Sequence, residues 1–182
     1  NKGALKLQGC SQYNLKNILA AISVGYFFKL STYEIQNALR NYIPSNNRSQ
    51  YIELNSNKII LDAYNANPSS MMEAINNIEM INHDKKVLIL GDMLELGTHS
   101  IDEHINILTK VEAIKPKTII LVGEMFSKAN KSNRNLCFKN NLDAIEYLKT
   151  NPIHDSLVLI KGSRGIKLET LLPYISTPWK RI

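Results

Sequence analysis

Hydrophobic positions in residues 1–44 recur with the spacing of α-helices. A first helix is predicted over residues 14–28, because four apolar residues follow the i, i+3, i+4, i+7 pattern: Leu15, Ile18, Leu19 and Ile22. A second helix is expected to begin at Ser31, where Glu34 completes a capping box, and to stop at Pro44. Each helix has one apolar stripe that needs a cover, so we interpret this segment as the helical end of a larger domain.

Residues 45–50 are polar and break this periodicity, and we interpret them as a linker between domains. In residues 51–182 short apolar runs alternate with helical patterns. Strands are expected at 51–54, 58–62, 87–91, 118–123, 136–138 and 157–161, the first two as a hairpin over 55–57. Two helices are expected to begin at capping boxes: 70–81 at Ser70–Glu73 and 100–114 at Ser100–Glu103. Two further helices are expected over 142–149 and 166–175. This alternation predicts an α/β fold with a doubly wound, mostly parallel, Rossmann-like sheet.

Composition narrows the class of protein. The 182 residues are 44% hydrophobic and 21% charged, as in globular proteins with a core. Cys10 and Cys137 are the only cysteines, so we expect no disulfide framework and a reducing compartment, most simply the cytoplasm. The longest apolar run, Ile18 to Phe28, is too short to span a membrane. Because the sequence opens with Asn1-Lys2-Gly3 and not with methionine, we expect it to start inside a longer gene product.

The charge pattern favours small anionic ligands over nucleic acid. The net charge is +6, from 22 basic and 16 acidic residues, but the basic residues are scattered and form no run interleaved with aromatic residues. The four histidines lack the spacing of metal ligands, so no metal site is expected in this chain. Of these, His104 is expected either on the surface or against a functional residue.

Ligands of open α/β sheets bind at the carboxyl ends of the strands, where three polar loops are expected here. In residues 61–70, Asp62 could accept hydrogen bonds from a ribose diol, and the following helix favours anions. Asp62 and the nearby asparagines could instead serve only the backbone of the turn. In residues 91–97, Asp92 and Glu95 could bind a cation or an amine, or the glycines could simply form turns.

The third loop, residues 161–165, follows one strand and precedes a helix. Lys161, Ser163 and Arg164 offer two cations and a hydroxyl, which suit a carboxylate or a phosphate, although a solvated turn is the alternative. The spacing is not that of a P-loop.

Taken in order and spacing, the three loops resemble the carboxyl-terminal domain of the Mur ligase family. The matching segments are 62–68, Asp-Ala-Tyr-Asn-Ala-Asn-Pro; 91–97, Gly-Asp-Met-Leu-Glu-Leu-Gly; and 161–164, Lys-Gly-Ser-Arg. Residues 13–21 resemble the family motif H-N-x-x-N-A-L-A-A at the end of its central ATPase domain. Two positions depart from the family: Tyr13 replaces the usual histidine, and Asn47 replaces the usual glycine before Arg48. Asparagine tolerates a left-handed backbone better than most residues.

The resemblance implies an ATP-dependent, amide-forming ligase of peptidoglycan synthesis that works with Mg²⁺. In the branch it resembles, ATP phosphorylates the carboxylate of UDP-N-acetylmuramoyl-tripeptide, and the amine of D-alanyl-D-alanine attacks the acyl phosphate. A cytoplasmic monomer without membrane insertion is implied for the parent enzyme. The family's P-loop and its metal-binding segment are expected upstream of residue 1. We therefore predict that the isolated chain folds but shows no turnover in an ATPase assay.

Residue roles implied by the resemblance fall into two groups. The first group would bind the nucleotide: Asn14, Asn17, Arg48, Asp62 and Asn65. Within it, Asn14 and Asn17 would lie near the adenine and Asp62 would bind the ribose. Arg48 would also act in catalysis, reaching the ATP phosphates as the domains close. The second group would bind the dipeptide carboxylate: Lys161, Ser163 and Arg164. Two alternatives remain, a receiver-like phosphoacceptor domain using Asp62, Asp92 and Lys161, and a pure interaction domain with an exposed apolar patch.

Overall fold

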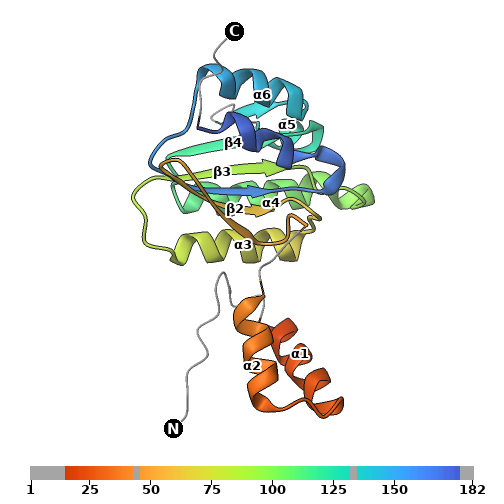
Figure 1. Ribbon diagram of the computed structural model, residues 1–182. Coiled ribbons are helices and arrows are strands. Elements are labelled where there is room, and N and C mark those ends of the chain that lie inside the picture. The colour runs from red at the N-terminus through yellow and green to blue at the C-terminus, as the bar shows by residue number, and fades with distance from the viewer. Residues whose placement is uncertain (1–14, 43–45, 132–134, 177–182) are drawn as a thin grey trace. The chain divides into compact units, whose positions relative to one another are not determined.

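The chain forms two compact units, residues 1–45 and 46–182, in a computed structural model that describes residues 15–42, 46–131 and 135–176 (Figure 1). The boundaries expected from the sequence, at residues 44 and 50, lie on either side of this division. Residues 46–49 form turns that lead into the first strand of the second unit. None of the helices in the described ranges is long and apolar enough to cross a membrane.

The first unit is a pair of helices, α1 (Leu15–Phe27) and α2 (Thr32–Asn41). The expected capping box is present, because the Ser31 hydroxyl accepts the Glu34 N–H and the Glu34 carboxylate accepts the Ser31 N–H. The helices touch where Gly25 packs on Ile35, the one buried apolar side chain among the described residues of this unit. Many large apolar side chains are exposed, which fits helices that need a cover: Leu15, Leu19, Val24, Tyr26, Phe27, Phe28, Leu30, Tyr33 and Tyr42.

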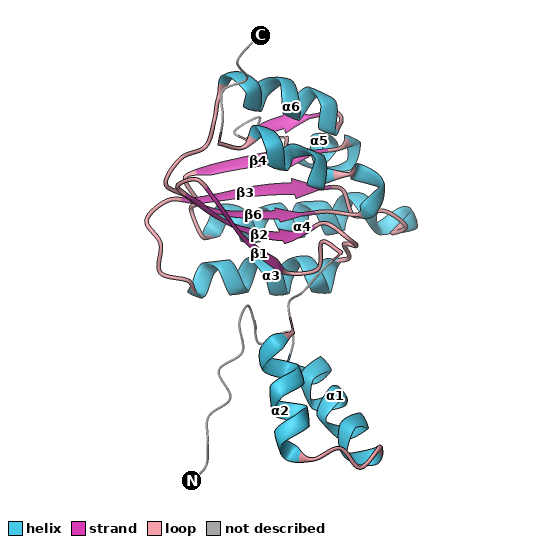
Figure 2. Cartoon of the chain, viewed as in Figure 1, coloured by secondary structure: helices cyan, strands magenta, loops and turns pink. Residues whose placement is uncertain are grey.

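The second unit is built on a sheet whose strands run in the order β1-β2-β6-β3-β4-β5 in the described part of the chain (Figure 2). The strands are β1 (Gln50–Leu54), β2 (Asn57–Asp62), β3 (Lys86–Gly91), β4 (Thr118–Val122), β5 (Leu136–Phe138) and β6 (Leu157–Lys161). Only β1 is antiparallel to its neighbour, so the prediction of a doubly wound, mostly parallel sheet is confirmed. The β1–β2 turn holds two residues, Asn55 and Ser56, and not the three expected.

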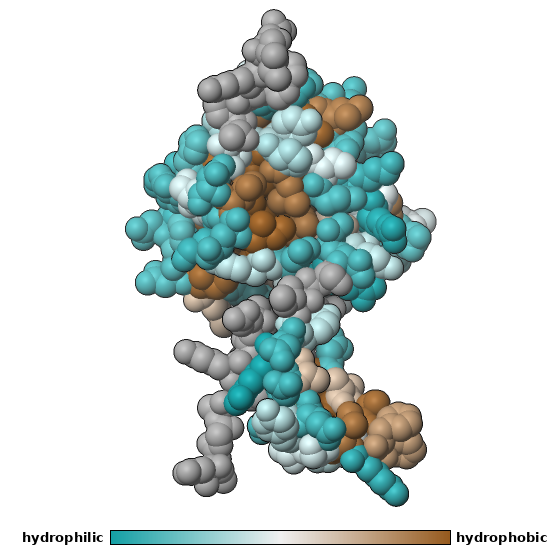
Figure 3. Space-filling view, viewed as in Figure 1, coloured by the Kyte–Doolittle hydropathy of each residue, from teal (hydrophilic) through white to brown (hydrophobic). Residues whose placement is uncertain are grey.

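Helices cover both faces of this sheet. On one face, α6 (Asn141–Thr150) and the 3₁₀ segment η4 (Leu168–Tyr174) pack on the strands through one apolar cluster. On the other, α3 (Pro68–Met80), α4 (Ser100–Ala113) and α5 (Glu124–Ala129) pack through a second cluster. Figure 3 shows apolar side chains gathered over the middle of the second unit in this view. The two clusters fix the strands, and with them the loops that follow the strands.

One predicted helix start and two predicted N-caps were wrong, whereas helix α4 does begin at Ser100 as expected. Helix α3 begins at Pro68, because Asn67 is its N-cap and forms the capping box with Ser70, and Pro is well suited to the first helical position. At α4 the side chain of Ser100 is not the cap, since Ser100 already has helical backbone angles and follows the 3₁₀ turn η2 (Gly97–His99).

The end of the chain also differs from the prediction. The helix expected over 166–175 is instead two 3₁₀ segments, η3 (Arg164–Ile166) and η4. Lys167 between them is left-handed, with φ of +57°, and Pro173 has no N–H for an α-helical hydrogen bond. The short helix α5 was missed, because its stabilising cap comes from a distant loop.

Candidate functional site

The carboxyl ends of β2, β6 and β3 are neighbours in the sheet, so the three polar loops meet at one edge. In the strand register Asp62 lies opposite Lys161, and Lys161 lies opposite Leu90, one residue before the end of β3. The spatial convergence expected from the sequence is therefore present. What each side chain does at this edge differs from the expectation in several places.

Asp62 and Lys161 form an ion pair with 2.7 Å between Oδ2 and Nζ. The side chain of Lys161 is 2% exposed and that of Asp62 is 16% exposed. The Lys161 ammonium also donates to the carbonyl of Asn65, and Asp62 Oδ1 accepts the N–H of Ser49 at 3.1 Å. The Lys161 ammonium is thus buried and bonded to groups of the protein itself. In this geometry it is not accessible to a substrate carboxylate. The pair instead ties the 46–49 turn and the loop after β2 to the end of β6.

Ser163 connects all three loops. It is buried, and its hydroxyl accepts the N–H of Leu94 at 2.9 Å and donates to the carbonyl of Ala66 at 3.5 Å. Its own N–H donates to the carbonyl of Asp92 at 3.1 Å. The expected contact between this hydroxyl and a ligand is therefore not supported by the geometry, since the hydroxyl holds the loops in register.

Asp92 does not offer an open carboxylate. It is 4% exposed, and its oxygens accept the N–H groups of Met125 and Phe126, each at 2.9 Å. These are the first-turn donors of α5, which a carboxylate satisfies well. Glu95, by contrast, is exposed, with φ of +67°. The receiver-like alternative fails here, because it needs an accessible carboxylate at Asp92.

His104 is fully buried against the loop after β3, which settles the choice left open by the sequence in favour of a contact with Asp92. Its Nδ1 lies 2.6 Å from the carbonyl of Ser100 and its Nε2 accepts the N–H of Met93 at 3.0 Å. A carbonyl can only accept and an N–H can only donate, so the proton is on Nδ1 and the ring is neutral. The 3.6 Å approach of Nε2 to Asp92 is accordingly a contact with an uncharged ring.

Two arginines flank one tyrosine at the same edge. The guanidinium carbon of Arg48 lies 4.0 Å from the centre of the Tyr64 ring, and that of Arg164 lies 5.3 Å from it. Hydrogen bonding to Arg48 and its positive charge lower the pKa of the Tyr64 hydroxyl below its usual value, with a smaller contribution from Arg164. Both arginines are exposed, and neither pairs with a carboxylate in the described ranges. Before Arg48, Asn47 has φ of +57°, the backbone that a glycine would favour.

The asparagines expected at the nucleotide give no direct support. Asn14 lies outside the described residues, and Asn17 is exposed on α1 in the first unit. Asn65 is exposed after β2, but its side-chain oxygen accepts the N–H of Ala66 at 2.8 Å, as a turn asparagine does. Their roles stay predictions. Tyr64, on the other hand, was missed, because its two arginine neighbours come from distant parts of the sequence.

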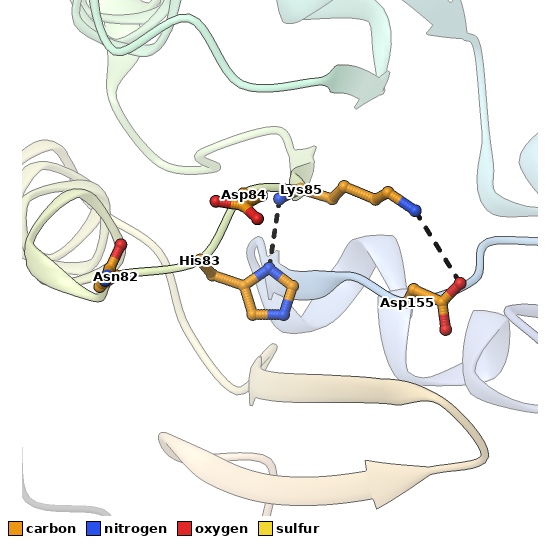
Figure 4. Close-up of a pocket in the computed structure, with 5 residues that line it drawn as sticks. All are labelled: Asn82, His83, Asp84, Lys85 and Asp155. Atoms are coloured by element: carbon orange, nitrogen blue, oxygen red, sulfur yellow. Dashed lines mark hydrogen bonds and ion pairs between the residues drawn. The ribbon is translucent and has the colours of Figure 1, made fainter.

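A shallow depression lies at the opposite edge of the sheet, where the strands begin (Figure 4). Its lining is Asn82, His83, Asp84, Lys85 and Asp155. His83 accepts the N–H of Lys85 through Nδ1, and the Lys85 ammonium lies 3.8 Å from Asp155 in an exposed ion pair. Across the ranges that the structure describes, no three His, Cys, Asp or Glu side chains are placed to hold a metal ion. In this class of fold the amino-end edge is not where ligands bind, so we place the site at the other edge.

The domain is of the doubly wound α/β class and carries a polar edge at the carboxyl ends of its parallel strands. The chain belongs to the Mur ligase family, since residues 47–164 match the model of its domain described as "Mur ligase, glutamate ligase domain". It is 31% identical over 170 residues to the UDP-N-acetylmuramoyl-tripeptide–D-alanyl-D-alanine ligase of Bacillus subtilis (strain 168), covering 88% of this chain and 37% of that protein. The enzyme of the same name from Buchnera aphidicola subsp. Acyrthosiphon pisum is 33% identical over 163 residues, covering 87% of this chain and 36% of the relative.

Solved structures agree with this assignment. A crystal structure of MurF from Acinetobacter baumannii aligns with a TM-score of 0.84 and 27% identity, covering 94% of this chain and 39% of that one. A folylpolyglutamate synthase from Mycobacterium tuberculosis aligns with a TM-score of 0.66 at 18% identity, which shows the shared fold alone. The chain thus spans a little over a third of the length of the relatives it matches, 37% of the Bacillus subtilis enzyme.

Proposed function

We propose that this chain is part of a longer ATP-dependent ligase that joins D-alanyl-D-alanine to UDP-N-acetylmuramoyl-tripeptide in peptidoglycan synthesis. The names of its relatives support this reaction, and one structural observation carries it: two exposed arginines without carboxylate partners in the described ranges, Arg48 and Arg164, stand together at the carboxyl edge of the sheet. Every reactant of such a ligase carries a phosphate or a carboxylate group. An edge with unpaired guanidinium groups suits phosphates and carboxylates.

The reaction has two steps. The tripeptide carboxylate attacks the γ-phosphorus of ATP, and ADP leaves. The uncharged amine of D-alanyl-D-alanine then attacks the acyl carbon, a tetrahedral intermediate forms, and phosphate leaves as the amine loses its proton. Negative charge develops on oxygen in both steps, so fixed positive groups lower both barriers. Mg²⁺ bound with ATP would neutralise further phosphate charge.

We assign Arg48 to the ATP phosphates and Arg164 to the dipeptide carboxylate. Asp62 is assigned to the ribose: although both its oxygens are engaged, a carboxylate has about four acceptor sites, and 16% of this side chain is exposed. Lys161 and Ser163 act by holding Asp62 and Arg164 in place and do not touch substrate. Asn14, Asn17 and Asn65 keep their expected places near the nucleotide as part of this proposal.

Neutralising Arg164 is expected to weaken the dipeptide specifically. Arg164→Gln in the complete ligase should raise KM for D-alanyl-D-alanine by roughly 10- to 100-fold, the worth of a charge-assisted hydrogen bond, with KM for ATP changed much less. Steady-state kinetics with each substrate varied in turn measures this. Lys58→Gln is the matched control, since Lys58 is an exposed cation at the far end of β2. An equal rise in both KM values would contradict the assignment of Arg164.

The proposed reaction itself is tested by its product. The complete ligase is incubated with ATP, UDP-N-acetylmuramoyl-tripeptide and D-alanyl-D-alanine, and the nucleotide products are identified by mass spectrometry. We expect UDP-N-acetylmuramoyl-pentapeptide and ADP. Ligation of a single amino acid in place of the dipeptide would exclude the proposed substrate. We also propose that the complete enzyme is a cytoplasmic monomer. The presence of only two cysteines fits the reducing conditions of the cytoplasm.

A further inference from the structure

We propose that Tyr64 is a positioning residue: it holds Arg48 and Arg164 as one cationic pair, so that the nucleotide and dipeptide sites form together. This inference rests on the proposed function for the roles of the arginines, and on geometry alone for their association. Tyr64 lies in the 62–68 segment that matches the family, but the sequence alone indicates no role for it. Both guanidinium groups lie against its ring.

Hydrogen bonds to Asp62 and Asn65 connect the three segments that carry Arg48, Tyr64 and Arg164. The 46–49 turn, which carries Arg48, is bonded to Asp62 through the N–H of Ser49 at 3.1 Å. The loop after β6, which carries Arg164, starts at Lys161, whose ammonium bonds both Asp62 and the carbonyl of Asn65. These bonds flank Tyr64 in the sequence on both sides. The ring is therefore held where both arginines can reach it.

Two guanidinium groups at one place repel each other, and no carboxylate from the described residues offsets their charge. The negative face of an aromatic ring compensates part of this repulsion, because it attracts each guanidinium group. Such a ring keeps the two cations together while leaving their charge available to an anionic ligand. A carboxylate in the same position would neutralise the arginines and compete with substrate.

The association of Tyr64 with the arginines can be measured without any ligase activity. Ultraviolet titration of the 182-residue chain reports the ionisation of its eight tyrosines. The arginines lower the pKa of Tyr64, so we expect Tyr64→Phe to remove an ionisation from the low-pH side of the curve and Arg48→Gln to shift that ionisation upward. If the titration curve of Tyr64→Phe has the same shape as the parent curve, scaled from eight tyrosines to seven, then the arginines do not contact Tyr64 in solution and the proposal is overturned.

The positioning role is measured in the complete ligase. Tyr64→Leu removes the ring and is expected to raise KM for ATP and for D-alanyl-D-alanine by roughly three- to fivefold each, with kcat changed less. Tyr64→Phe keeps the ring face and should restore both KM values to within about twofold. Tyr51→Leu is the control, because Tyr51 is an exposed tyrosine on β1 and neither Arg48 nor Arg164 lies over its ring.

Combining the variants separates positioning from general damage. In the Arg48→Gln background, Tyr64→Leu should no longer affect KM for ATP but should still raise KM for the dipeptide. Unchanged KM values in Tyr64→Leu, or equal effects with and without Arg48, would overturn the proposal. If the enzyme ligates no D-alanyl-D-alanine at all, the proposed function fails, and the titration still decides whether Tyr64 holds the arginines.

Discussion

Asp62→Ala is expected to lower the free energy of unfolding by about 3–5 kcal/mol, the effect of breaking a buried ion pair from one side. The variant would leave the Lys161 ammonium, whose side chain is 2% exposed, without its carboxylate. It would also leave the N–H of Ser49 without the acceptor that fixes the 46–49 turn. Urea denaturation of the chain, followed by circular dichroism, measures the loss.

A second substitution makes this prediction specific. Asp62→Ala combined with Lys161→Met should be more stable than Asp62→Ala alone, because the unpaired buried charge is gone. Lys110→Met is the control: Lys110 and Glu79 form a 2.6 Å pair at the surface, and its loss should cost less than about 1 kcal/mol. Strictly additive losses for Asp62 and Lys161 would show that the two do not act as a pair.

Gly123→Ala is expected to destabilise the chain by about 3–5 kcal/mol, from backbone strain together with the loss of a buried cap. Gly123 has φ of +129°, and an added Cβ would overlap the Asp92 carboxylate group, which would have to move. That carboxylate accepts the N–H groups of Met125 and Phe126 in the first turn of α5. Displacing it therefore removes the cap of this helix as well. Thermal and urea unfolding should both show the loss.

Gly97→Ala provides the comparison for Gly123→Ala. Gly97 also has a positive φ, +57°, but nothing lies within 4 Å of an added Cβ. Only the backbone strain remains, so its cost should be near 1 kcal/mol. Equal destabilisation by the two substitutions would mean that the contact with Asp92 is unimportant.

The sheet could be predicted from the sequence because its signals are local. Val87–Leu90 and Leu157–Ile160 are unbroken apolar runs, and such runs are typical of parallel strands buried on both faces. Helix α5 could not be predicted, because Asp92, which caps it, lies 33 and 34 residues from its bonded N–H groups. A short helix that depends on a distant side chain leaves little pattern of its own.

The meeting of the three loops at one edge could be predicted from the sequence, whereas the contacts that Lys161 and Ser163 make there could not. Lys161 and Ser163 have the chemistry of anion ligands, but their partners lie in loops 69–99 residues away along the chain, and those contacts bury them. The same holds for Asp92, which is buried and whose carboxylate oxygens accept the N–H groups of Met125 and Phe126. Burial and long-range partners decide whether a polar residue binds a ligand or holds a loop, and neither can be read from spacing.

Hydrogen–deuterium exchange on the complete ligase tests the central claim most directly. Exchange is compared with and without a non-hydrolysable ATP analogue and D-alanyl-D-alanine. The account predicts slower exchange in the segments of the carboxyl edge: 46–50, 62–67, 92–97 and 162–166. It predicts no change at the opposite edge, in segments 82–85 and 153–156. Protection at the opposite edge, with the four carboxyl-edge segments unchanged, would contradict the account.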